Sequence, residues 1–150
     1  MRLAIVVTAI GLMVASCGSS DQKATAAKPE IAPLKIGEVS LNGPVRALGT
    51  EPFWSVDLAA SGITFSRIDQ QPVTGASVEP KVTGNMAVWE TTLPDQRLLS
   101  VTMTGTDCSD GMSDRVYPLA AMVKIGEETL QGCAATLEAL ERASESGRVE

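Results

Sequence analysis

Short runs of alternating apolar and polar residues fill the middle of this chain and favour a fold that is built from β-strands. The clearest run covers residues 99–103, where Leu99, Val101 and Met103 alternate with serine and threonine. A period of two places every second side chain on the same face of a strand. Comparable runs, separated by Gly, Pro, Asn or Asp, cover residues 53–58, 63–66, 78–82, 86–93, 119–125 and 129–133.

Each of these runs leaves one face of its strand polar, which is typical of antiparallel sheets with one solvated side. We therefore expect an all-β domain of seven or eight strands over residues 35–144. Either a small antiparallel barrel or a compact two-layer β fold satisfies this pattern. The chain has 150 residues, which is enough for one such domain after an N-terminal leader.

The pattern changes near the C-terminus of the chain. Residues 134–144 contain no β-branched run, and Glu138 and Arg142 have the i,i+4 spacing of a helical ion pair. These features predict a short C-terminal helix. The last residues, 145–150, are expected to fray.

The N-terminus has the features of a secretory leader. Arg2 precedes an almost unbroken apolar run over residues 3–14, which is shorter than the ~20 residues of a membrane-spanning helix. Two small residues then precede Cys17, and this arrangement resembles the lipobox at which bacteria acylate a cysteine and cut the chain before it. We expect a signal peptide over residues 1–16, with ordinary Ala-x-Ala-like cleavage as the alternative.

Acylation of Cys17 would attach the protein to a membrane through lipid. Residues 17–34 are rich in Ser, Ala, Lys and Pro, which predicts a flexible tether behind the lipidated cysteine. Gly18 stands where an aspartate would signal retention at the inner membrane, and this favours the outer membrane, facing the periplasm. The expected location is therefore the bacterial cell envelope.

Composition excludes several classes of function. The chain has no histidine, so it lacks a histidine base for a serine or cysteine nucleophile and histidine ligands for zinc, copper or haem iron. Its 12 Lys and Arg stand against 18 Asp and Glu, a net charge of −6. An acidic chain without a basic block binds nucleic acid poorly. We expect a monomer with no nucleic-acid partner.

Cys108 and Cys133 are the cysteines that remain once Cys17 carries lipid. In an oxidising compartment such a pair predicts one disulfide, which would close a segment of about 25 residues. A free thiol pair or a redox site is the alternative, although the chain has no Cys-x-x-Cys motif.

Residues 49–54, Gly-Thr-Glu-Pro-Phe-Trp, place two adjacent aromatic residues directly after a corner in the chain. Phe53 and Trp54 point to opposite faces of a strand, so one of them is exposed unless both faces are covered. One interpretation is an aromatic binding anchor beside the Glu51 carboxylate. The other is a core tryptophan, with Glu51 bonded to backbone amides at the corner.

Residues 106–118 hold three aspartates and two serines within eight positions. The spacing does not fit an EF-hand, and a calcium site of another type is a minor alternative. The preferred interpretation is a disulfide-pinned loop whose Asp and Ser side chains cap turns, with Asp110 or Asp114 pairing with Arg115. A loop that presents Asp110, Arg115 and Tyr117 to a partner is the third interpretation.

Together these two stretches define a candidate binding surface, and they carry a family resemblance. The members of the surface are Glu51, Trp54, Asp110, Asp114, Arg115 and Tyr117. The motifs at residues 49–54, 108–114, 117–118 and 130–133 resemble a family of uncharacterised bacterial envelope proteins, whose members often carry a lipobox. The resemblance covers residues 46–134 and implies a small secreted β domain with a Cys108–Cys133 bridge. It implies no reaction, because the family has no established activity.

We expect a lipid-anchored binding or structural domain of the envelope rather than an enzyme. The first hypothesis is a protein-binding module, for example an inhibitor of a basic envelope-directed enzyme such as lysozyme, which an acidic chain would attract. The second is a domain that binds a small ligand or a metal in envelope stress, in a pocket with Glu51, Asp110 and Asp114. The least favoured is a hydrolase that pairs Glu51 with one of these aspartates.

Four methionines, Met86, Met103, Met112 and Met122, raise the question of a soft copper(I) site. Met103 and Met122 fall in predicted strands, where methionine is expected to fill the core. We therefore expect no metal and no cofactor.

Overall fold

The computed structural model describes residues 34–150. The predicted signal peptide, Cys17 and the predicted tether up to residue 33 lie outside these described residues. Within residues 34–150, no helix is long and apolar enough to cross a membrane.

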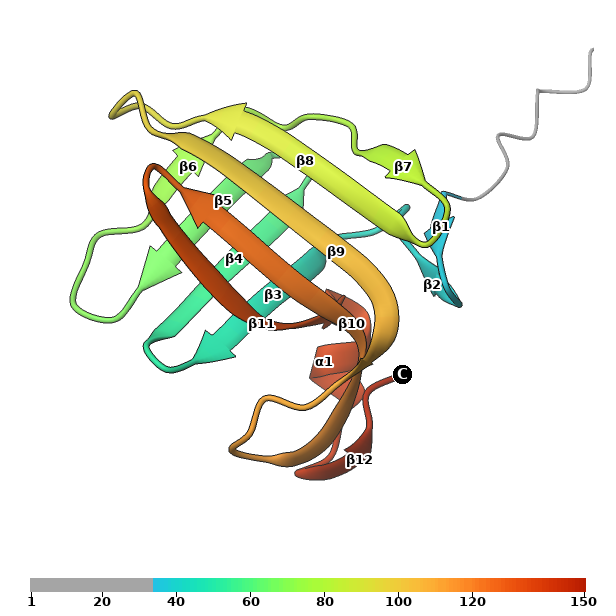
Figure 1. Ribbon diagram of the computed structural model, residues 1–150. Helices are drawn as coiled ribbons and strands as arrows, with labels where there is room; N and C mark the ends of the chain where they lie inside the picture. Colours follow the sequence, from blue (N-terminus) through green and yellow to red (C-terminus); the bar gives the residue numbers. More distant parts are fainter. Residues whose placement is uncertain (1–33) are drawn as a thin grey trace, which may run out of the picture. The chain divides into compact units, whose positions relative to one another are not determined.

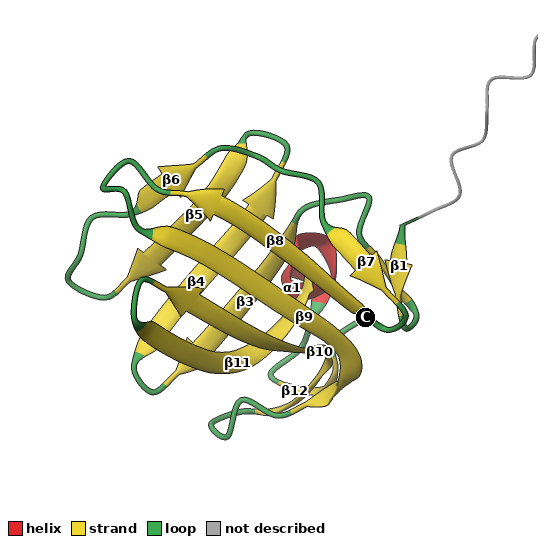
Figure 2. Cartoon of the chain, turned by 45° about the horizontal axis from the view of Figure 1, so that its top comes forward, coloured by secondary structure: helices red, strands yellow, loops and turns green. Residues whose placement is uncertain are grey.

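Strands dominate the described part of the chain, which confirms the all-β prediction. They are β1 (Lys35–Ile36), β2 (Val39–Ser40), β3 (Val45–Thr50), β4 (Phe53–Ala59), β5 (Gly62–Arg67), β6 (Val73–Gly75), β7 (Lys81–Thr83), β8 (Met86–Thr92), β9 (Leu98–Cys108), β10 (Asp114–Ile125), β11 (Glu128–Thr136) and β12 (Ser146–Arg148). One short helix, α1 (Leu137–Arg142), follows β11 (Figure 2). The strands outnumber the seven or eight expected because β1, β2, β6 and β12 are too short to show a period of two, and because β3 was not among the predicted runs.

One continuous antiparallel sheet contains most of the strands, in the order β6-β5-β4-β3-β11-β10-β9-β8-β7. The sheet folds over on itself into two layers: β8, β9 and β10 lie in front in Figure 1, and β3, β4 and β5 lie behind them. Its end strands, β6 and β7, do not pair with each other within residues 34–150, so the sheet is not closed. Of the two architectures expected, the two-layer fold is the correct one.

Strand β11 joins the two layers. Its residues 128–134 pair with β10, and its residues 133–136 pair with β3. The two ladders overlap only at Cys133 and Ala134, so β11 leaves the front layer just where it enters the back layer. Both layers therefore depend on the course of this one strand.

The main core lies between the layers and follows the alternation seen in the sequence. Leu99, Val101 and Met103 of β9 are fully buried. The inward residues of β4, β5 and β10 are almost fully buried; they are Trp54, Val56, Leu58, Ile63, Phe65, Leu119, Ala121, Val123 and Ile125. Because burial of a large apolar side chain contributes about 1.5–3 kcal/mol, these positions are the main source of stability.

A second, smaller core lies on the opposite face of the sheet. It consists of Tyr117, Cys133, Ala135, Ala139 and Val149. Cys133 and Ala135 flank an inward residue of β11, so their side chains point away from the main core. Tyr117 of β10 also belongs to this cluster, and helix α1 and the C-terminal segment cover the face with Ala139 and Val149.

The predictions for the C-terminus are partly wrong. The helix begins at Leu137 instead of residue 134, because β11 continues to Thr136, whose hydroxyl caps the helix by accepting the Ala139 amide (3.1 Å). The expected fraying of residues 145–150 is wrong, since β12 pairs in parallel with the start of β10 and Val149 is fully buried. The domain therefore extends beyond residue 144.

Other predicted boundaries also change. Strand β3 has no counterpart among the alternating runs, and residues 114–118, expected in a loop, form the first part of β10. A register shift between Tyr117 and Leu119 interrupts the alternation of β10 at that point. Of the predicted strand 78–82, only the end is a strand, because β7 starts at Lys81.

Val149→Ala is expected to lower the free energy of unfolding by about 1–2 kcal/mol, because it leaves a cavity in the second core. Deletion of residues 145–150 should cost more, since it also removes the ion pair in which Arg148 makes two hydrogen bonds to Asp107 (2.8 Å each). Denaturation by urea, followed by tryptophan fluorescence, measures both changes. Glu145→Ala, at an exposed position, is the control; an unchanged midpoint for Val149→Ala would contradict this packing.

Candidate functional site

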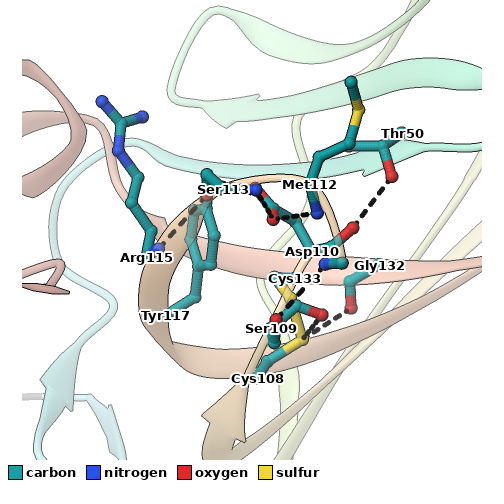
Figure 3. Close-up of a disulfide and its surroundings, with 11 residues drawn as sticks. Thr50, Cys108, Ser109, Asp110, Met112, Ser113, Arg115, Tyr117, Gly132 and Cys133 are labelled. Carbon is teal, nitrogen blue, oxygen red and sulfur yellow. Dashed lines mark hydrogen bonds between the residues drawn. A yellow bond between two sulfur atoms is a disulfide. The ribbon is translucent and has the colours of Figure 1, made fainter. Parts of the chain in front are cut away.

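The disulfide predicted between Cys108 and Cys133 is present, with a Cα–Cα distance of 5.6 Å. It fastens the β9–β10 loop, residues 109–113, to strand β11 (Figure 3). The Cys108 sulfur also lies 3.4 Å from the carbonyl oxygen of Gly132. This is a packing contact, since a disulfide sulfur has no proton to donate.

Asp110 organises the β9–β10 loop from within (Figure 3). Its Oδ1 atom accepts the backbone amides of Met112 (3.0 Å) and Ser113 (2.8 Å). Its Oδ2 atom accepts the hydroxyl groups of Ser113 (2.8 Å) and Tyr117 (3.0 Å). The turn-capping interpretation of this loop is therefore confirmed.

These hydrogen bonds stabilise the ionised form of Asp110. Partial burial raises the pKa of its carboxyl group, but the two amides and two hydroxyls that stabilise the ionised form outweigh burial and lower the pKa to about 2. Burial raises the pKa of Tyr117, and the neighbouring Asp110 carboxylate raises it further. At neutral pH the pair is therefore an ionised carboxylate and a protonated phenol.

The two sequence stretches meet at this loop. The Thr50 hydroxyl donates to the Asp110 carbonyl oxygen (2.9 Å), which joins the corner at residues 49–54 to the β9–β10 loop (Figure 3). Strand register explains this contact. Cys133 pairs with Leu48, which is two residues before Thr50 in β3, and the disulfide joins Cys133 to Cys108 at the start of the loop. The corner and the loop thus form neighbouring walls of one surface.

A depression of about 720 Å³ opens between these walls and the outer face of the front layer, and we call it the loop-corner depression. Residues 49–51 of the corner, Cys108 at the end of β9 and residues 109–112 of the loop contribute to its lining. Outward residues of four strands form its floor: Met86, Thr102, Thr104, Ala120, Met122 and Gln131. No lining residue is basic, and two lining residues, Glu51 and Asp110, are acidic.

Trp54 does not belong to the depression. It is buried in the main core, whereas Phe53 is half exposed at 49%. The core-tryptophan interpretation is therefore confirmed, and Trp54 is not part of a binding surface. The expected hydrogen bonds from backbone amides to the Glu51 carboxylate do not occur within residues 34–150; Glu51 is exposed and lines the depression.

Two glycines make room for the Trp54 indole. A Cβ atom at Gly49 would lie 2.6 Å from the indole Cε2, and one at Gly132 would lie 2.9 Å from Cζ2. Gly49 belongs to β3 and Gly132 to β11, so the ring extends from β4 across β3 as far as β11. The corner motif therefore fixes the packing of the core as well as one wall of the depression.

The other candidate residues are not presented as a surface. Tyr117 is only 2% exposed and reaches Asp110 with its hydroxyl. The Nε of Arg115 donates to the carbonyl oxygen of Ser144 (2.8 Å), so the expected pairing of Arg115 with an aspartate is wrong. Asp114 is exposed at the start of β10, outside the depression. The candidates that line the depression are Glu51 and Asp110.

The aspartates of the loop region are not grouped as calcium ligands in residues 34–150. Asp107 pairs with Arg148 of β12 (2.8 Å), which lowers the pKa of Asp107, and the Asp110 carboxylate is bound within the loop. In the part of the chain that the structure describes, no three carboxylate or cysteine side chains lie close enough to hold a metal ion.

The outward residues of the front layer were missed by the sequence reasoning. Met122, expected to fill the core, is 40% exposed and lines the depression, whereas Met103 is fully buried as expected. The alternation of apolar residues in β10 already indicated that Met122 points outward. Ala121 and Val123 point inward, so the residue between them must point outward.

Gly49→Ala is expected to destabilise the domain by about 2–3 kcal/mol, because the added methyl group would overlap the Trp54 indole. Gly43→Ala is the matched control, since nothing lies within 4 Å of a Cβ atom at that position. Thermal unfolding followed by circular dichroism compares the two variants. Equal melting temperatures would show that Gly49 has no packing role.

Asp110→Asn is expected to lower the free energy of unfolding at neutral pH by about 1–2 kcal/mol, after allowance for solvent screening. The pKa of Asp110 falls from 3.8 to about 2 on folding, so its ionised form stabilises the fold fully above about pH 4 and less as the pH approaches 2. The difference in stability between wild type and variant should therefore shrink over this range in urea denaturation. Glu127→Gln, at an exposed position, is the control, and a difference independent of pH would contradict the assignment.

Comparisons with known proteins find no match to this chain among protein-family models, curated proteins or solved structures. The loop-corner depression is therefore interpreted from its own residues and their contacts. Its walls are the corner and the β9–β10 loop, and its floor is a set of outward methionine, threonine, alanine and glutamine side chains.

Proposed function

We propose that this chain is a lipid-anchored domain of the bacterial envelope whose loop-corner depression binds a basic segment of a partner protein. The observation that carries the proposal is the hydrogen bond from Thr50 to the Asp110 carbonyl (2.9 Å). It joins two segments that are 60 residues apart in the chain along one concave surface. Concave surfaces with a few convergent polar groups are the usual form of binding sites.

The walls of the depression are fixed before any partner arrives. The Cys108–Cys133 disulfide holds one end of the β9–β10 loop, and four hydrogen bonds to Asp110 hold its turn. The corner is held by the Trp54 ring in the main core. Walls that are already ordered reduce the entropy lost on binding, which favours affinity.

The lining of the depression suits a segment that is both apolar and positively charged. Methionine side chains on the floor provide adaptable apolar contact, and Glu51 provides negative charge. No lining residue is basic, and the chain as a whole has a net charge of −6. A basic protein is attracted to such a surface from a distance. A basic envelope-directed enzyme such as a lysozyme has this chemistry.

The location is part of the same proposal. The apolar run before Cys17 and the two small residues beside it support a lipid anchor, in the outer membrane and facing the periplasm. The resemblance of the corner and the β9–β10 loop to bacterial envelope proteins supports the same compartment. A disulfide also fits an oxidising environment.

A hydrolase with paired carboxylates receives less support from this geometry. With a pKa of about 2, Asp110 is ionised at neutral pH, and both of its carboxylate oxygens accept hydrogen bonds from the loop and from Tyr117. A general acid needs a raised pKa and access to its substrate. Asp114 lies outside the depression and cannot replace it there.

Glu51→Lys is expected to weaken binding of a basic partner at least tenfold, because it reverses the charge beside the depression. Binding of several lysozyme types to the immobilised full chain, together with inhibition of their activity, gives the measurement. Glu79→Lys makes the same change in net charge at an exposed position outside the depression and is expected to change affinity less than threefold.

Two results would count against the proposal. Absence of binding and inhibition for every lysozyme type at micromolar concentration would exclude this class of partner. Equal loss of affinity in Glu51→Lys and Glu79→Lys would show that net charge, and not the depression, attracts the partner.

A further inference from the structure

In residues 34–150, exposed methionines occur only at the loop-corner depression. Met112 is 67% exposed, Met122 is 40% exposed and Met86 is 39% exposed, and all three line the depression. Met103, the other methionine of this part of the chain, is fully buried in the main core. A reagent in solution that attacks methionine therefore meets it first at the surface proposed to bind a partner.

Met112 is the most exposed large apolar side chain of the described residues. Its backbone amide is held by Oδ1 of Asp110 (3.0 Å), and the disulfide of Cys108 fixes the start of the same loop. Figure 3 shows the Met112 side chain beside Thr50, on the wall of the depression. An ordered backbone thus presents an open thioether to solvent.

A thioether of this kind is a substrate for peroxides. A sulfur lone pair attacks one peroxide oxygen, the O–O bond breaks and water leaves, so sulfur is oxidised by two electrons and the peroxide is reduced. The product is methionine sulfoxide, in which a polar oxygen stands on a formerly apolar side chain. Because the oxidant has to reach the sulfur atom, exposed methionines react before buried ones.

We infer that Met112 is a site of oxidation to the sulfoxide by peroxides, and that this modification weakens binding of a partner in the loop-corner depression. No free thiol of the described residues would consume the peroxide first, because Cys108 and Cys133 form a disulfide. The effect on affinity rests on the proposed function, since it requires that the depression binds a partner. The oxidation itself does not.

The loss of affinity follows from the polar groups of the depression. The Asp110 carboxylate already accepts four hydrogen bonds, so Glu51 is the carboxylate of the lining that is left for a basic group of the partner. The methionines then face the apolar parts of the bound segment. A sulfoxide oxygen buried there without a hydrogen-bond donor opposes binding, and we expect affinity to fall roughly tenfold.

Peptide mapping by mass spectrometry tests the modification without any partner. The full chain carries Cys17→Ser, so that no free thiol competes, and is treated briefly with hydrogen peroxide at neutral pH. Met112 is expected to oxidise before Met86 and Met122. Met103 should react roughly tenfold more slowly than Met112, or not at all, whereas in urea the four should react at similar rates. Oxidation of Met103 as fast as Met112 in the folded protein would overturn the inference.

Binding to the lysozyme types is then compared before and after oxidation, once the peroxide has been removed. A background of Met86→Leu and Met122→Leu leaves Met112 as the exposed methionine of the described residues, and affinity should fall roughly tenfold on treatment. Met112→Leu in the same background is the matched control and should show no change on treatment. Met112→Gln, which is polar without oxidation, should bind roughly tenfold more weakly than Met112→Leu.

The outcomes separate this inference from the proposed function. Equal affinity before and after oxidation of Met112, or an equal loss in Met112→Leu, would overturn the effect on binding. An untreated chain that binds no lysozyme type would contradict the proposed function and the effect on binding together. The peptide map would still decide whether Met112 is the oxidation site.

Discussion

Both layers of this domain meet on the nine residues of β11, and their junction depends on two glycines that leave room for one indole ring. Strand β11 pairs with β10 as far as Ala134 and with β3 from Cys133 onward, so its pairing partner changes directly after Gly132. A Cβ atom at Gly132 would overlap the Leu48 carbonyl oxygen and press on the Trp54 ring, and one at Gly49 would overlap the same ring. The two glycines therefore allow both the close approach of β11 to β3 and the position of the Trp54 ring in the core.

The loop-corner depression follows from that junction. Because side chains alternate along a strand, Cys133 points to the face opposite the main core, where its disulfide holds the β9–β10 loop. Since Cys133 also pairs with Leu48, the loop arrives beside Thr50 and the two are joined by a hydrogen bond. Packing inside the core thus decides where the outer walls stand. A disulfide in a segment of this length also contributes roughly 3–4 kcal/mol by restricting the unfolded chain.

Alternation predicted the strands whose inward residues are large and whose outward residues are polar, such as β9 and the second half of β10. It did not predict β3, because the outward Leu48 packs against the second core and the inward Gly49 is small, so the two faces look alike. Strand β12 is too short to show a period, and it is held by pairing with a distant strand. The meeting of the corner and the loop depends on pairing between β3 and β11, which no local pattern records.

The outer faces of the back layer and the front layer are both solvated, but they carry different kinds of side chain. On the outer face of the back layer, residues opposite each other form polar pairs: Arg46 bonds to Asp57, and the Thr64 and Thr74 hydroxyls lie 2.9 Å apart. Such cross-strand pairs are what an exposed face needs for stability. The corresponding floor of the loop-corner depression carries two thioethers instead, with a third on its wall. Exposed apolar side chains that gather at one concave site support the proposal that this surface binds a partner. The difference between the two outer faces is the reason why the proposal places binding on the front layer.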